Sequence, residues 1–205
     1  MLRNMISAMA CFVSLLPATC WSCSEQKRAE IMDFPTAEFQ EGDLAFRRGR
    51  SFESRAVLEA DSGGLYSHVG ILARRDGQWR VVHAVPGERE EGDSIDRVKV
   101  ESLEAFFASD RAATGEIVRL VDAGDGSLAA RKALSKEGIP FDHDYDLADT
   151  SRLYCTELIA HAYNTTGGHL NADSLTEVNF PLFGGTYLLP SAIYQHNRHI
   201  TIFKY

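Results

Sequence analysis

A β-hairpin predicted within residues 67–85 is the feature that most constrains how this chain can fold. Its two strands are rich in apolar side chains, and the residues between them read Arg-Arg-Asp-Gly, which is typical of a tight turn. Either all four residues form the loop, or Asp76 and Gly77 alone form a two-residue turn. His68 lies opposite His83 in the first register and diagonal to it in the second. Both registers place the two imidazoles on one face, because strand side chains alternate with a period of two.

Two neighbouring imidazoles fit three uses: a pair packed in the core, a metal site, or a general base with the group that orients it. A zinc site is the weaker of the two functional interpretations. Cys155 would add only a third ligand, and residues 24–205 contain no Cys-x-x-Cys or His-x-x-x-His pair. We therefore predict no metal.

Cys155 lies near the start of a helix predicted at 153–163. It begins an apolar stripe with i, i+3, i+4, i+7 spacing, formed by Cys155, Leu158, Ile159 and Ala162. The capping-type run at 149–151 places the thiol in the first turn, where unpaired N–H groups and the helix dipole favour thiolate. An inert buried thiol is the alternative. Together with the two histidines, Cys155 fits nucleophilic catalysis, in which an oriented imidazole activates a thiol.

The remaining pattern predicts one α+β domain over residues 42–205. Further strands are predicted at 43–46, 98–100, 116–121 and 200–205. The apolar fraction of 44% suits a globular core. The net charge of −8, with 21 Lys and Arg against 29 Asp and Glu, argues against nucleic acid as a partner.

The N-terminus has the pattern of an export signal. Arg3 precedes eleven mainly apolar residues at 6–16, too few to span a membrane as a helix. We predict a signal peptide over 1–22, a linker over 23–41, and a location in the periplasm or cell envelope. A buried N-terminal helix is the alternative. Cys20 or Cys23 can accept a lipid anchor, or the two can form a disulfide with each other.

Four sequence blocks resemble the YiiX/YaeF-type permuted papain-like amidases, a circularly permuted branch of the NlpC-type cysteine peptidases. The blocks are Gly42-Asp43-Leu44, Ser67-His68-Val69-Gly70-Ile71, Phe141-Asp142 with Tyr145-Asp146, and Leu153-Tyr154-Cys155-Thr156-Glu157-Leu158. The resemblance implies a circularly permuted papain-like (NlpC-type) fold, in which an antiparallel sheet packs against the helix that carries the catalytic cysteine. Permutation places the histidine strand before the cysteine helix, as in this chain.

By position, the resemblance makes Cys155 the nucleophile, His68 its base and His83 the third catalytic residue. In the family that the chain resembles, many relatives have Glu in the third place, so His83 departs from that pattern. A histidine there is similar to the lecithin–retinol acyltransferases, whose Asn-Cys-Glu-His block is absent here. We expect Ser67, Tyr154 and Thr156 to contact the substrate.

The resemblance implies an exported cysteine hydrolase that cleaves an amide or isopeptide bond through an S-acyl enzyme, with cell-wall peptide fragments as natural substrates. Two alternatives stay open: an acyltransferase or lipid (thio)esterase that uses the same thiol, or a catalytically silent amide-binding module. The expected partners are small peptide, amide or acyl substrates, with no cofactor. We expect a monomer, attached to a membrane if Cys20 or Cys23 carries lipid.

Overall fold

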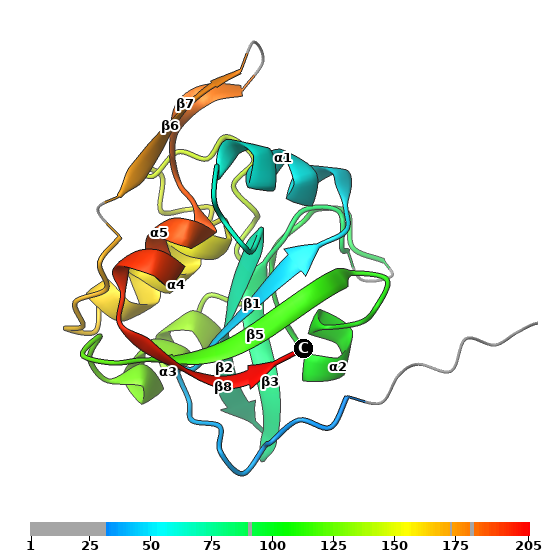
Figure 1. The fold of residues 1–205 in the computed structure, drawn as a ribbon, viewed down its shortest axis with the longest axis vertical. Helices are drawn as coiled ribbons and strands as arrows, with labels where there is room; N and C mark the ends of the chain where they lie inside the picture. The colour runs from blue at the N-terminus through cyan, green and yellow to red at the C-terminus, as the bar shows by residue number, and fades with distance from the viewer. Residues whose placement is uncertain (1–31, 90–91, 173, 181–182) are drawn as a thin grey trace, which may run out of the picture.

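The computed structural model describes residues 32–89, 92–172, 174–180 and 183–205 (Figure 1). Within them a six-stranded antiparallel sheet has the order β4-β3-β2-β1-β5-β8. Its strands are β1 (Leu44–Gly49), β2 (His68–Arg75), β3 (Gln78–Ala84), β4 (Val98–Glu101), β5 (Ala112–Leu120) and β8 (His199–Lys204). A separate hairpin, which projects from the body in Figure 1, consists of β6 (Leu175–Phe180) and β7 (Phe183–Leu188).

Five helices accompany the strands in the described residues: α1 (Phe52–Ala60), α2 (Leu103–Phe106), α3 (Gly126–Leu134), α4 (Cys155–Asn164) and α5 (Pro190–His196). Helices α3 and α4 pack against each other and against β2. None of the described helices is long and apolar enough to cross a membrane. The arrangement confirms the predicted α+β class, with an antiparallel sheet packed against the helix that carries Cys155.

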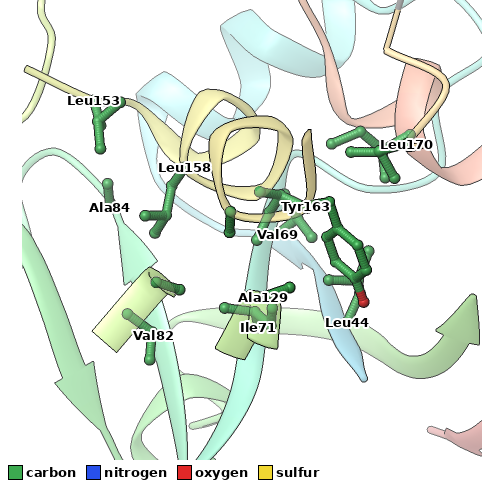
Figure 2. Close-up of a cluster of buried hydrophobic side chains, with 14 of the residues drawn as sticks. Leu44, Val69, Ile71, Val82, Ala84, Ala129, Leu153, Leu158, Tyr163 and Leu170 are labelled. Carbon is green, nitrogen blue, oxygen red and sulfur yellow. The ribbon is translucent and has the colours of Figure 1, made fainter. Parts of the chain in front are cut away.

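The larger core lies between the sheet and helices α3 and α4 (Figure 2). Leu158 of α4 faces strand residues Val69, Ile71 and Val82, and all four are fully buried. The i, i+3, i+4, i+7 stripe is therefore the packed face of α4, as its spacing predicts. Each large side chain buried here contributes about 1.5–3 kcal/mol, and this packing fixes where the first turn of α4 lies against the sheet.

A second core covers the other face of the sheet and includes Leu72, Val81, Phe106 and Phe107. Part of the predicted linker belongs to it: Phe39 is buried, and the Phe34 ring lies 5.8 Å from the Phe107 ring. Residues 32–41 therefore pack on the domain. The predicted signal peptide at 1–22, with Cys20, and the first part of the linker, with Cys23, lie outside the described residues.

The hairpin adopts the two-residue turn. Arg75 pairs with Gln78, and Asp76 and Gly77 have φ angles of 51° and 76°, as a type I′ turn requires. By contrast, the predicted capping run at 149–151 is wrong. Helix α4 begins only at Cys155, and its N-cap residue is Tyr154. Residues 149–151 lie too far before this start to cap the helix, because a cap must be the residue that directly precedes the first helical residue.

Candidate active site

His68 and His83 contact each other directly. His68 is the first residue of β2, and His83 is the second-last residue of β3. The distance between His68 Nε2 and His83 Nδ1 is 2.8 Å, and both residues are buried. The structure therefore confirms that the hairpin brings the two imidazoles together. Because His83 engages the Nε2 atom of His68, the Nδ1 atom of His68 is the nitrogen left for a reaction partner.

Gly70 makes this contact possible. A Cβ atom at Gly70 would lie 2.4 Å from Val81 Cγ1 and 3.1 Å from His83 Cβ. The first distance is shorter than any normal contact, so a side chain here would push into β3. The missing side chain lets Val81 and the Cβ atom of His83 lie this close to β2, which is a physical reason for the glycine in the Ser-His-Val-Gly block.

The two rings lie on the sheet face that carries the second core. The Phe106 ring packs against both, with centroid distances of 5.6 Å to His68 and 5.0 Å to His83. Helix α4 packs on the opposite face. His68 still lines the same pocket as Cys155. Both residues begin their elements, so the site lies where the start of β2 meets the start of α4.

Beyond His83 lies the carboxylate of Glu101, whose contact with His83 was not predicted from the sequence. Glu101, the last residue of β4, places its Oε1 atom 2.9 Å from His83 Nε2, and its side chain is only 10% exposed. The sequence predicted a strand at 98–100 but assigned no role to Lys99 or Glu101. The structure buries Lys99 and most of Glu101 on the histidine side.

Cys155 is the first residue of α4 and is half-buried. Backbone N–H groups of Val69, Thr156 and Cys155 lie near enough to its sulfur to lower the pKa of the thiol. These donors and nearby Arg47 favour thiolate, but burial outweighs them and raises the pKa of Cys155 to about 11. The expectation that the helix start lowers this pKa is therefore wrong for the resting structure, because a helix terminus is a weaker influence here than desolvation.

The pKa values of the two histidines shift in the opposite direction, downward. Burial, followed by the positive charges of Arg47 and Lys99, lowers the pKa of His68 well below its ordinary value. Burial also lowers the pKa of His83, although Glu101 opposes it. At rest the thiol and the imidazole are therefore both neutral.

A pocket of about 660 Å³ opens beside Cys155 and His68. Helix α1 forms one wall, and the segment from Tyr187 to Pro190 forms another. The lining is mainly apolar and includes Phe52, Val57, Ala60, Val85, Phe141, Tyr145, Val178, Leu188 and Leu189. The reactive atom therefore faces a cavity suited to a molecule with an apolar part.

The three residues expected to contact substrate, Ser67, Tyr154 and Thr156, also line the pocket. Their hydroxyl groups contact the backbone. Ser67 Oγ accepts from the Gly49 N–H at 2.8 Å. The Tyr154 hydroxyl accepts from the Leu188 N–H at 3.1 Å, and the Thr156 hydroxyl donates to the Leu188 carbonyl at 2.6 Å. Two of the three thus hold the end of β7 against the start of α4.

A thiol at a helix start, a histidine on an adjacent antiparallel strand and a second group that orients it define a papain-like cysteine hydrolase, here with the histidine strand first in the chain. Residues 38–198 match the family described as permuted papain-like amidase enzyme, YaeF/YiiX, C92 family. The chain belongs to this family of cysteine peptidases and amidases.

Among solved structures, the chain is similar to one described as the metalloprotein yiiX from Escherichia coli O157:H7. The two share 21% sequence identity and a TM-score of 0.63, over 81% of this chain and 97% of the other. This likeness shows a common fold. No curated protein matches the chain. In the described residues of this chain, no group of three or more His, Cys, Asp or Glu side chains is arranged to hold a metal ion.

Proposed function

We propose that the chain hydrolyses an amide or isopeptide bond through a thioester on Cys155. One observation carries the proposal: Cys155 and His68 line one pocket, and His83 binds the far nitrogen of His68. A nucleophile, a base and an orienting group are the parts that acyl transfer to water requires.

In the first half of the reaction, the Cys155 sulfur attacks the carbonyl carbon while its proton passes to His68 Nδ1. Negative charge develops on the carbonyl oxygen, where the N–H groups of Val69 and Thr156 are available as donors. The C–N bond then breaks, and the amine leaves with the proton from His68. In the second half, His68 takes a proton from water and the hydroxyl adds to the thioester. The C–S bond then breaks to release the acid, and the sulfur takes the proton back from His68, which restores both the thiol and the free base.

The lining of the pocket favours an apolar acyl group. The walls near Cys155 are formed by residues such as Val57, Ala60 and Leu188, and burying an acyl chain against them contributes about 0.8 kcal/mol per CH₂ group. Cell-wall peptide fragments carry charges that this lining would desolvate at a cost. The apolar lining therefore supports a second candidate activity, an acyltransferase or lipid (thio)esterase that uses the same thiol.

Intact mass spectrometry with a substrate panel tests both candidates. The panel contains N-acyl amides and acyl thioesters of increasing chain length, together with peptidoglycan peptides. We expect an acyl adduct on Cys155 that forms faster with longer chains, and we expect no adduct on Cys155→Ala. Ala60→Phe narrows the pocket and should slow the long-chain substrates more than the short ones.

The fate of the adduct separates the candidates. Loss of the adduct to water with amide substrates supports the hydrolase. Transfer of the acyl group to an added alcohol or amine in preference to water supports the acyltransferase. A folded protein that forms no adduct with any panel member contradicts both, and favours the silent binding module.

The export of the chain is part of the proposal and rests on the pattern of residues 1–22. We propose that the mature protein acts as a monomer in the periplasm or cell envelope. The mass of the protein recovered from a bacterial host tests this. Cleavage near residue 22 supports export, and added mass on Cys20 or Cys23 equal to a diacylglyceryl group supports a lipid anchor. An uncleaved chain recovered from the cytoplasm contradicts both.

A further inference from the structure

A buried ion cluster lies beyond the histidine pair. It consists of Arg47 of β1, Glu88 after β3, Lys99 and Glu101 of β4, and Arg111 just before β5; Arg111 is its most exposed member, with a third of its side chain in solvent. Glu101 Oε2 lies 3.0 Å from Lys99 Nζ and 2.9 Å from Arg111 Nη1. Both cations contact the Oε2 atom, and the other carboxylate oxygen, Oε1, faces His83.

The cluster keeps Glu101 ionised. Lys99 Nζ and Arg111 Nη1 lie 3.0 and 2.9 Å from its Oε2 atom. Burial disfavours the charged form, but neighbouring His83 and Lys99 outweigh burial and hold the pKa of Glu101 well below its usual range. An ionised carboxylate can only accept hydrogen bonds. His83 Nε2 lies 2.9 Å from Glu101 Oε1, although neither atom forms a hydrogen bond of standard geometry within the described residues. An unprotonated Nε2 would place its lone pair against the carboxylate at this distance, so Nε2 carries the proton.

This assignment fixes the protons on both neutral imidazoles. With its proton on Nε2, His83 presents a lone pair at Nδ1. His68 Nε2, at 2.8 Å, must then donate to that lone pair. His68 is left with its lone pair on Nδ1, the nitrogen that the proposed function requires to accept the proton of Cys155. The other tautomer of His68 carries its proton on Nδ1 and cannot accept the proton of Cys155 there.

The charges around His68 show why the carboxylate matters. Arg47 and Lys99 both disfavour a positive charge on His68. Arg111 adds a third cation beside Glu101, and Glu88 is already shared with Arg47 and Lys99. Of these groups, Glu101 is the carboxylate in contact with an imidazole. Its charge is therefore placed to offset the three cations when His68 becomes protonated.

We infer that Glu101 is a positioning residue of the Cys155 site, which acts through His83 to fix the tautomer of His68 and to stabilise its protonated form. The inference deepens the proposed function and rests on it.

Alkylation of Cys155 by iodoacetamide tests the inference in the full chain, read from the peptide that contains Cys155. The rate is measured from about pH 6 to about pH 11, which spans the ordinary pKa values of histidine and cysteine. The neutral-pH rate reports proton transfer from Cys155 to His68, and the alkaline rate reports the free thiolate. Glu101→Gln is compared with Glu88→Gln, which removes the other carboxylate that Lys99 and Arg111 share.

We expect Glu101→Gln to lower the neutral-pH rate about tenfold, the effect of a one-unit fall in the pKa of His68, and to leave the alkaline rate unchanged. Glu88→Gln should lower the neutral-pH rate less than Glu101→Gln does, because Glu88 balances the same cations but contacts neither histidine in the structure. A neutral-pH rate in Glu101→Gln equal to that of the wild type overturns the inference, and so does an equal loss in both variants.

If Glu101→Gln does not fold by circular dichroism, Glu101→Asp takes its place. Aspartate keeps the charge for Lys99 and Arg111 but is one CH₂ group too short to hold His83 as well. We expect a several-fold loss at neutral pH with an unchanged alkaline rate, and a wild-type profile overturns the inference. Because alkylation needs no substrate, an inactive panel of acyl donors would refute the proposed function without affecting this result.

Discussion

The carboxylate of Glu157 accepts a hydrogen bond of 3.0 Å from the backbone N–H of Tyr154, the residue immediately before Cys155. The bond satisfies one of the unpaired donors at the start of α4 and so fixes the backbone that carries the thiol. Glu157 itself is 7% exposed. Burial raises the pKa of Glu157 to about 7. The hydrogen bond from the Tyr154 N–H lowers this pKa, whereas the negative charge of Asp142 raises it further. The cap is therefore a carboxyl group that titrates near neutrality.

Glu157→Gln should stabilise the protein at alkaline pH and have little effect at acid pH. The folded pKa of about 7 exceeds the unfolded value of about 4.3, so the stability from the protonated form is complete below about pH 4.3 and is lost as the pH rises through 7. Glutamine keeps a hydrogen-bond acceptor for Tyr154 without the charge. We expect a rise in Tm of roughly 2–4 °C at about pH 8, the effect of about 1 kcal/mol in a domain of this size.

The matched control is Glu104→Gln, which removes a negative charge from an exposed position of α2. Its Tm should differ from that of the wild type by less than about 1 °C at both pH values, as surface changes usually do. A Glu157→Gln variant that is destabilised equally at about pH 5 and about pH 8 would show that the carboxyl group caps α4 in a way that glutamine cannot reproduce.

Alkylation of Cys155 in the wild-type chain should rise mainly at alkaline pH. Burial raises its pKa to about 11, above the value of about 8.5 for an unperturbed thiol, so the neutral thiol predominates at physiological pH. We expect the rate constant to keep increasing beyond about pH 9, with a smaller neutral-pH component that disappears in His68→Ala. A single transition well below pH 8 would instead indicate a thiolate–imidazolium pair that exists at rest.

The histidine contact was predictable from the sequence because it depends on local rules. The Asp76-Gly77 turn and the alternation of the strands place His68 and His83 on one face in either register. The stripe that starts at Cys155 likewise predicted the packed face of α4, although not the residue at which the helix begins. Local patterns determine which side chains share a face.

Glu101 was not predictable, because its contact with His83 depends on the pairing of β4 with β3. That register is set across a 13-residue connection and is not fixed by a short turn. The pKa of Cys155 was unpredictable for a related reason. Desolvation is the sum of contributions from the whole fold, whereas the helix start that was visible in the sequence is a local influence. The packing of Phe34 and Phe39 is also non-local.

Gly70→Ala should damage the site by separating the two hairpin strands. The new Cβ atom would lie 2.4 Å from Val81 Cγ1 and 3.1 Å from His83 Cβ. Overpacking of this kind costs about 1–3 kcal/mol, measurable by urea unfolding. The double variant Gly70→Ala/Val81→Ala removes the closer of the two contacts and should be less destabilised than the sum of the single changes. Simple additivity would mean that Val81 is not the obstacle.

His68 and His83 should differ in their effect on catalysis. His68→Ala removes the base and should lower kcat/KM nearly as much as Cys155→Ala, because nucleophile and base act as a unit. His83→Gln keeps a polar partner for His68 Nε2 and should retain part of the rate, with a loss of about 10²-fold or less, the lower end of what general-base catalysis contributes. Equal losses in folded His68→Ala and His83→Gln would make His83 more than an orienting group.

His83→Glu tests whether a carboxylate can take the third place of the site, as the resemblance to the family implies. The substitution offers His68 a carboxylate directly, but it puts that carboxylate beside Glu101, which lies 2.9 Å from the present His83 ring. Two neighbouring buried carboxylates raise each other's pKa, so one of them takes up a proton and the gain for His68 is partly lost.

His83→Glu/Glu101→Gln removes the second charge and should be at least several-fold more active than His83→Glu alone, with the difference largest near neutral pH. Steady-state rates from about pH 5 to about pH 9 check this, with circular dichroism to confirm that both variants fold. A double variant no more active than His83→Glu would show that the two carboxylates do not compete and that the chain tolerates either arrangement.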